Sequence, residues 1–111
     1  MFGVSSANFL QSGYGLNAET EMKMLRVLDS ARRRVPIEIS STFCGAHAVP
    51  RGSNMEAATR DVTDNQLEQV MKSVRAGELN VENIDVFCEK GVFEISQSRR
   101  ILEAGKKAGL R

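Results

Sequence analysis

The 111-residue sequence lacks several features that would place a protein in a class at once. Its two cysteines, Cys44 and Cys88, are too few for a disulfide scaffold and indicate reduced, buried thiols of an intracellular protein. No apolar run approaches the ~20 residues that cross a bilayer, and the first ten residues do not resemble a signal peptide. Lysine and arginine number 15 against 14 acidic residues, so no net field attracts nucleic acid or a membrane.

Aromatic and histidine side chains are also scarce. Aromatic residues make up 5% of the chain, and none interleaves with Arg32, Arg33 and Arg34, so this basic run lacks the stacking partners of a nucleic-acid site. His47 is the only histidine, and one histidine without a partner at ligand spacing cannot close a zinc site. Hydrophobic content of 41% and charged content of 26% are typical of a globular domain.

The first part of the chain predicts a strand followed by a helix. Residues 4–11 form a weak strand pattern, and Asn17 is placed to cap a helix with acidic residues in its first turn. Pro36 is expected to end this helix near Arg34, because the residue before a proline avoids the helical region. The apolar stripe expected to be buried consists of Met24, Leu25, Leu28 and Ala31.

A second strand and helix follow. Residues 37–43 are rich in β-branched and aromatic side chains and lead into the turn that carries His47. Ser53 and Glu56 have the spacing of a capping box, and the helix after them is expected to break within residues 61–64 and to end at Gly77. Its buried face is predicted to include Leu67, Val70, Met71 and Val74.

The third part predicts a short strand at residues 84–88 and a helix that Ser96 caps and Gly109 ends. The predicted buried face of this helix consists of Ile101, Leu102 and Ala108. Strands that alternate with helices indicate parallel βαβ units whose strands lie side by side. The sequence stops where a fourth strand would begin, so the pattern predicts a barrel that is cut short.

Three blocks of sequence, in order, resemble imidazolonepropionase, a family of metal-dependent amidohydrolases of histidine degradation. They are residues 12–25, which begin Ser-Gly-Tyr-Gly, residues 42–50, which contain Cys-Gly-Ala-His-Ala, and residues 83–93. The resemblance extends over residues 12–111, whereas residues 1–10 do not resemble the strand that precedes Ser-Gly-Tyr-Gly in the family. We therefore expect residues 1–111 to be a single partial barrel segment with an atypical N-terminus.

This resemblance implies an α/β fold of three consecutive βα units from an incomplete (β/α)8 amidohydrolase barrel. It also implies a cytoplasmic enzyme, a homodimer, that hydrolyses 4-imidazolone-5-propanoate to N-formimidoyl-L-glutamate with one divalent metal, zinc or iron. The metal activates a water by lowering its pKa. The family's metal ligands and its general-base glutamate have no counterpart in this sequence. We therefore expect the isolated chain to bind no metal and to be inactive.

Two residues match positions that contact substrate in the family. Tyr14 lies in the Ser-Gly-Tyr-Gly turn, and His47 follows the next strand; both are expected at the C-terminal ends of barrel strands, where barrel active sites are built. A surface tyrosine and a histidine bonded to its own turn are the alternative interpretations. Glu89 follows the third strand and is expected either to support the site or to form a surface ion pair with Lys90 or an arginine.

Two other hypotheses remain from the sequence. In one, the chain is an inert fragment that associates through open sheet edges. In the other, it is a thiol enzyme that pairs Cys44 with His47. The second is weakly supported, because nucleophile and base must be close in space and not merely in sequence.

Overall fold

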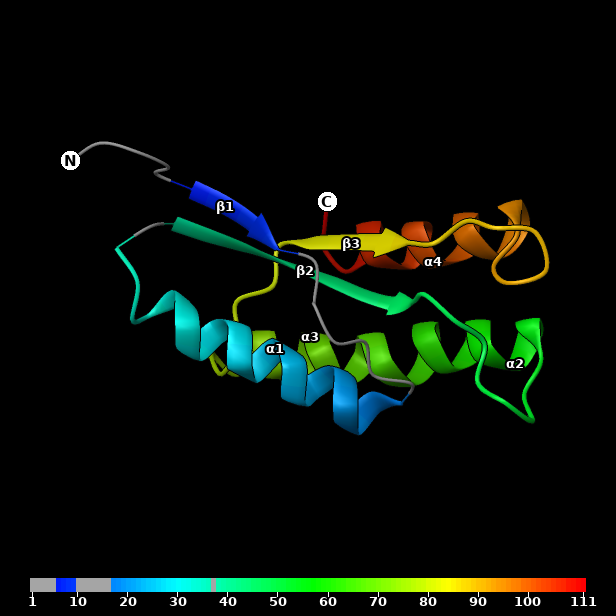
Figure 1. The fold of residues 1–111 in the computed structure, drawn as a ribbon, viewed down its shortest axis with the longest axis horizontal. Helices are drawn as coiled ribbons and strands as arrows, with labels where there is room; N and C mark the ends of the chain where they lie inside the picture. Colours follow the sequence, from blue (N-terminus) through cyan, green and yellow to red (C-terminus); the bar gives the residue numbers. More distant parts are fainter. Residues whose placement is uncertain (1–5, 10–16, 37) are drawn as a thin grey trace.

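The computed structural model describes residues 6–9, 17–36 and 38–111. Strands and helices alternate along these residues, with a π-helical segment, η1, between two α-helices (Figure 1). In chain order the elements are β1 (Ser6–Phe9), α1 (Ala18–Arg32), β2 (Glu38–Ala46), α2 (Met55–Arg60), η1 (Asp61–Gln66), α3 (Leu67–Arg75), β3 (Asn83–Val86) and α4 (Ile95–Lys107).

The three strands form one parallel sheet in the order β1-β2-β3. β1 pairs with β2 in a register that sets Phe9 opposite Ser41, and β2 pairs with β3 from Thr42 onward. The register between β2 and β3 is irregular between Phe43 and Ala46. The expected α/β class with a parallel sheet is thereby confirmed. The predicted strand at residues 4–11 is described only over β1, and its remaining residues lie outside the described part of the chain.

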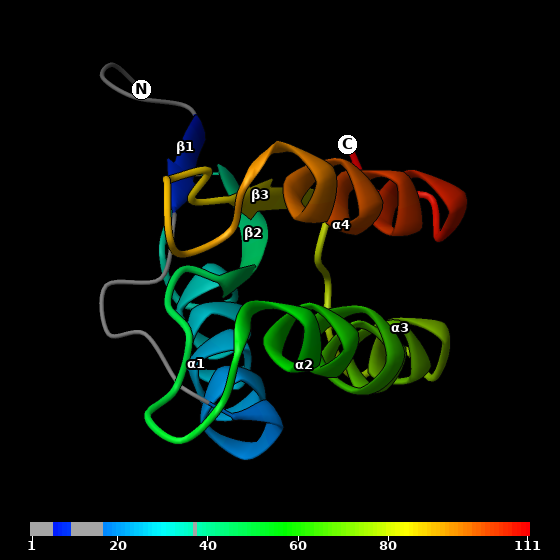
Figure 2. The ribbon, with the colours of Figure 1, turned by 90° about the vertical axis from the view of Figure 1, so that its right-hand side faces the viewer.

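All the helices gather on one side of the sheet (Figure 2). The core between them is built around Phe43 on β2, Phe93 in the loop before α4, and Ile101 on α4, which are all fully buried. Buried side chains of α1, η1 and α3 complete the core. The predicted buried face of α3 is confirmed for Leu67, Val70 and Met71, whereas Val74 is partly buried.

α1 begins as the sequence predicts. The Asn17 side chain accepts a hydrogen bond from the Thr20 backbone N–H at 3.0 Å, and the Thr20 side chain completes a capping box. The predicted apolar stripe does not match the buried face of α1. Leu25 is its only fully buried member. The buried positions are instead Ala18, Glu21, Met22, Leu25 and Asp29, so α1 turns a face containing two carboxylates toward the protein.

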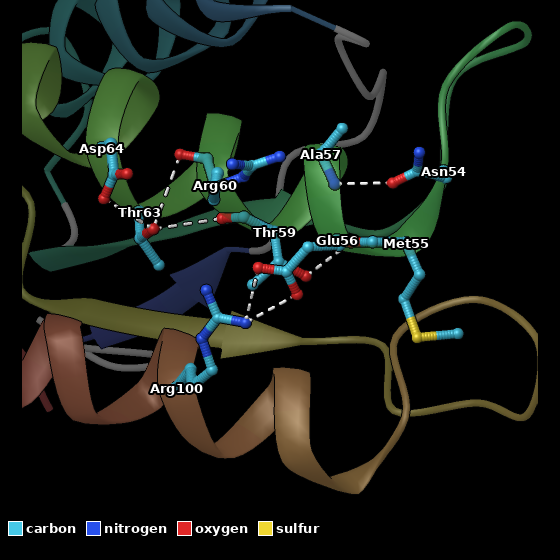
Figure 3. A network of polar contacts seen from close by, with 9 residues as sticks. All are labelled: Asn54, Met55, Glu56, Ala57, Thr59, Arg60, Thr63, Asp64 and Arg100. Carbon is cyan, nitrogen blue, oxygen red and sulfur yellow. Dashed lines mark hydrogen bonds and ion pairs between the residues drawn. The ribbon is translucent and has the colours of Figure 1, made fainter.

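α2 begins one residue later than predicted. Asn54, not Ser53, is its N-cap, and its side-chain oxygen accepts from the Ala57 backbone N–H at 2.8 Å (Figure 3). The predicted capping box is therefore wrong, because Asn and Ser are both good caps and the sequence offers them side by side. The expected break appears as η1, where Thr63 donates its hydroxyl to the Thr59 carbonyl.

Helices α2 and α4 are also joined across the surface. Arg100 donates to both carboxylate oxygens of Glu56, at 3.0 and 2.8 Å (Figure 3). This ion pair, in which Nη1 of Arg100 contacts both oxygens, links residues 44 positions apart in sequence. Both side chains are about half exposed, so the pair stabilises the docking of α4 only weakly.

Three expectations for β3 and α4 are wrong. The N-cap of α4 is Glu94 and not Ser96, and Leu102 is 42% exposed although its spacing predicted burial. Cys88 is exposed as well. Ala108 is half-buried against the core, and Gly109 ends the helix at a φ of 98°, as predicted.

The outer edge of β3 is already paired where the chain ends. Arg111 donates its backbone N–H to the Glu82 carbonyl at 2.9 Å, and its own carbonyl accepts from the Ile84 N–H at 2.7 Å. This is the pattern of a parallel pairing opposite Asn83. Because neighbouring residues of a strand direct their backbone groups to opposite sides and Asn83 pairs with β2, Arg111 lies on the side of β3 away from β2.

Candidate functional site

His47 lies immediately after β2, where the register with β3 is irregular. Its Nδ1 lies 3.1 Å from the Cys44 carbonyl oxygen. A carbonyl oxygen can only accept a hydrogen bond, so Nδ1 carries a proton and donates it. The neutral ring is therefore the Nδ1–H tautomer, and Nε2 is the nitrogen with a lone pair.

A second acceptor faces the same ring nitrogen. The Oε1 atom of Glu21, on α1, lies 3.9 Å from His47 Nδ1. The Glu21 side chain is 0% exposed and the His47 side chain 6% exposed, so the two groups meet inside the protein. Phe87, just after β3, meets the imidazole edge-on with ring centroids 6.4 Å apart. The Glu21 side chain of α1, the Cys44 carbonyl of β2 and the Phe87 ring thus converge on His47.

Burial governs the electrostatics of this site. It lowers the pKa of His47, and the hydrogen bond to the Cys44 carbonyl opposes that shift in part. His47 is therefore neutral at pH 7. Burial, with the charges of Asp85 and Glu21, raises the pKa of Cys44 to about 12. A thiol with that pKa stays protonated, which argues against the hypothesis that Cys44 is a nucleophile.

The predicted pairing of Tyr14 with His47 stays a prediction, because Tyr14 lies outside the described residues. β1 and β2 are neighbouring parallel strands, so their C-terminal ends share one edge of the sheet. His47 follows β2 at that edge. Glu89 is exposed, and its backbone N–H donates to the Phe93 carbonyl at 2.9 Å in the turn before α4.

A small hollow of about 260 Å³ lies between the end of β2 and η1. Gly45, Asp61 and Gln66 line it, and the Gln66 amide donates to Asp61 at 2.8 Å. A Cβ at Gly45 would collide with Gln66 Oε1 and would lie 2.7 Å from the Phe43 ring. Gly45 thus lets the Gln66 side chain of η1 and the Phe43 ring lie close to the backbone beside the His47 turn.

The sequence analysis missed Glu21. The signal was present, because Glu21 stands at the i+3 position from Ala18, beside Met22 and one turn before Leu25, in the buried phase of α1. A carboxylate in such a phase is rarely buried without a partner. The weakly apolar helix concealed that phase, and its apolar residues predict a stripe that is displaced from the buried face.

Neither a metal cluster nor a membrane span is found in the described part of the chain. Over residues 6–9, 17–36 and 38–111, no three His, Cys, Asp or Glu side chains are grouped to hold a metal ion. Within these ranges the structure offers no ligand set for the divalent metal that the family resemblance implies. No helix within the same ranges is long and apolar enough to cross a bilayer.

Comparison with known proteins confirms the resemblance. The chain is 61% identical over 100 residues to a protein from Nematostella vectensis named probable imidazolonepropionase. It is 54% identical over 100 residues to the human protein of that name and 50% identical over 101 residues to that of Dictyostelium discoideum. Each match covers 90% of this chain but only 23–24% of the relative, so the chain spans about a quarter of their length. No protein-family model matches the sequence.

Proposed function

We propose that this chain, which is similar over nine tenths of its length to a segment of imidazolonepropionases, forms part of such an enzyme. The complete enzyme would hydrolyse 4-imidazolone-5-propanoate to N-formimidoyl-L-glutamate. The identity of 50–61% to relatives that all carry one name is the observation that supports this proposal most strongly. The substrate is then a small molecule with a carboxylate and a cyclic amide.

The arrangement of strands supports a barrel. In a (β/α)8 barrel, consecutive parallel strands are neighbours and the helices cover the outside. The described sheet has its strands in sequential order, with helices on one side (Figure 2). A fourth parallel strand would begin with the pairing that Arg111 makes beside β3. We therefore assign the elements to consecutive βα units of an amidohydrolase barrel.

An apolar hollow next to β3 supports the same assignment. It measures about 420 Å³ and is lined by Val86 and Cys88 at one wall and by Ile95 and Leu102 of α4 at the other. Ile95 is 73% exposed, an unusual setting for so large an apolar side chain. In the proposed barrel the next βα unit covers this hollow and buries both α4 side chains.

Within the enzyme, His47 and Tyr14 would bind the substrate. With Nδ1–H donated to the Cys44 carbonyl, Nε2 is the ring atom that would contact the substrate. A neutral Nε2 accepts a hydrogen bond, and a protonated one donates to an oxyanion formed on hydrolysis. The Tyr14 hydroxyl would supply a second hydrogen bond from the neighbouring strand.

The metal belongs to the proposal but not to the described residues. One divalent ion, zinc or iron, would supply an activated water in the complete enzyme. Its ligands would come from other parts of that enzyme, since the described residues offer no cluster for it. A homodimer in the cytoplasm completes the proposal and rests on the resemblance alone.

A segment exchange tests the function. The matching ~100 residues of the human relative, 54% identical, are replaced by this chain, and hydrolysis of 4-imidazolone-5-propanoate is measured. We expect the chimera to retain turnover, His47→Asn to reduce kcat/KM at least tenfold, and the exposed Cys88→Ala to change little. A chimera that folds but shows no turnover would contradict the proposed function. Full activity in His47→Asn would contradict the role proposed for that residue.

The second candidate is an inert fragment that associates through the hollow beside β3. The exposed Ile95 and Leu102 favour it, because an uncovered apolar surface promotes association. Assayed alone with zinc or iron, the chain is expected to show no turnover, and any metal-dependent turnover would rule this candidate out. Sedimentation of the isolated chain as a monomer at 100 μM, a concentration on the order of those at which exposed apolar surface aggregates, would also contradict it.

A further inference from the structure

The buried carboxylate beside the candidate substrate-binding histidine has no role in the function proposed so far. We propose that Glu21 is a positioning residue that holds His47 in the tautomer with the proton on Nδ1, so that Nε2 is kept for the substrate. This inference rests on the proposed function of His47. The 3.9 Å approach of Glu21 Oε1 to His47 Nδ1 is the contact that carries it.

The burial of Glu21 needs a physical reason. Its side chain is 0% exposed, although it stands in the first turn of a helix whose opposite face is open to solvent. Glutamate is almost never fully buried unless it is paired, because desolvating a carboxylate is costly. An apolar side chain there would continue the buried face made by Met22 and Leu25. The carboxylate is therefore at a position where packing alone favours another residue.

The geometry of the ring selects one tautomer. The Nδ1 atom faces two oxygens, the Cys44 carbonyl at 3.1 Å and Glu21 Oε1 at 3.9 Å. Neither a carbonyl nor a carboxylate can donate, so a lone pair on Nδ1 would be repelled by both. A proton on Nδ1 is attracted by both. The carbonyl holds the bond at short range, and the carboxylate adds a charge of the favourable sign.

Other charged groups near the ring act in the same direction or are neutral. Asp85, on β3, lies close enough to the site for its charge to act on Cys44 together with that of Glu21. The Cys44 thiol on β2 is protonated, and Phe87 carries no charge. On α1, Glu21 is the carboxylate that lies near the ring. Asp29 lies two turns farther along and is bound by Arg32 and Arg33.

The consequence for hydrolysis concerns Nε2. With Nδ1–H held by two acceptors, the ring cannot turn over without losing both contacts. A proton that reaches Nε2 then creates an imidazolium whose charge Glu21 stabilises. His47 can thus change from accepting to donating at one fixed atom.

Nuclear magnetic resonance of the chain itself tests this inference, because its single histidine gives one imidazole signal set. ¹⁵N shifts report the tautomer at pH 7, and a titration reports the pKa of His47. We expect wild type to show the Nδ1–H tautomer. Glu21→Gln should raise the Nε2–H fraction and lower the pKa of His47, because a nearby negative charge favours the protonated ring.

Asp29→Asn is the matched control, since it removes the other buried carboxylate of α1 without touching His47. It should leave the tautomer and the pKa of His47 unchanged. An unchanged tautomer and pKa in Glu21→Gln, or equal changes in both variants, would overturn the proposal. If Glu21→Gln does not fold, Glu21→Met, an apolar chain of similar length, gives the same comparison.

This result is separable from the proposed enzyme activity. The resonance measurements need no substrate and no metal, so their failure refutes only the role of Glu21. In the chimera, Glu21→Gln should lower kcat/KM and displace the pH profile, while Asp29→Asn should leave the profile in place. An inactive chimera with the expected histidine shifts would instead refute only the proposed function.

Discussion

Gly105 of α4 packs against Ile84 of β3, and replacing it should destabilise the protein. A Cβ built there would lie 2.5 Å from Ile84 Cγ2, 2.8 Å from Cδ1 and 3.2 Å from Cβ. Normal contacts between carbon atoms are about 3.5–4.0 Å, so Ile84 would have to move by roughly 1 Å. Rotation of the Ile84 side chain cannot relieve the contact with its Cβ.

Two effects of opposite sign decide the magnitude. Alanine is better than glycine in a helix interior by about 1 kcal/mol. Overpacking a closed core costs about 1–3 kcal/mol. We therefore expect Gly105→Ala to lower the free energy of unfolding by about 0–2 kcal/mol, instead of raising it as at an open helical site. Urea denaturation followed by circular dichroism measures this change.

A double-mutant cycle isolates the contact. Ile84→Ala removes the two nearest atoms and leaves only the 3.2 Å approach. In that background Gly105→Ala should become neutral or stabilising, giving a coupling of about 1–3 kcal/mol. A stabilising effect of Gly105→Ala in wild type, or the same effect in both backgrounds, would refute the close packing of α4 on β3. Measuring all four proteins in an osmolyte keeps the less stable ones folded.

Three further predictions concern the cap of α2, the two thiols and the histidine. Asn54→Ala should cost about 0.5–2 kcal/mol of unfolding free energy, while Ser53→Ala should cost little, and the reverse order in urea denaturation would contradict the assigned cap. Iodoacetamide should alkylate Cys88 and spare the buried Cys44 in the native state, which peptide mass spectrometry can verify. Stability should fall as the pH drops below ~6.5, because the unfolded histidine binds a proton there while the lowered pKa of folded His47 resists protonation. His47→Gln should flatten that slope, and an unchanged slope would show that other groups cause it.

Much of the local structure could be predicted from neighbouring residues. Asn17 caps α1, Gly109 ends α4, and Leu67, Val70 and Met71 turn inward, because capping and helical spacing depend on a few residues close in sequence. Wrong assignments occurred where two local solutions were similar. Ser53 competed with Asn54, and Leu102 lies one position from the fully buried Ile101.

The candidate site could likewise be predicted only in part. The sequence alone indicated His47, because a lone histidine after a β-branched run stands where barrel sites form, and the motif around it resembled a family. The protonation pattern depends on contacts that the sequence order conceals. Glu21 is 26 positions from His47 and reaches Nδ1 only because α1 packs against β2.

For this protein, then, the sequence by itself determined the α/β class, the Asn17 cap of α1 and the similarity to a segment of imidazolonepropionases. Tertiary structure alone decided which carboxylates are buried, that Cys44 holds its proton, and how closely Gly45 and Gly105 let their neighbours approach. The reason is physical. Backbone preferences and amphipathic periods act over a few residues, whereas desolvation, pKa values and packing depend on groups brought together from distant parts of the chain.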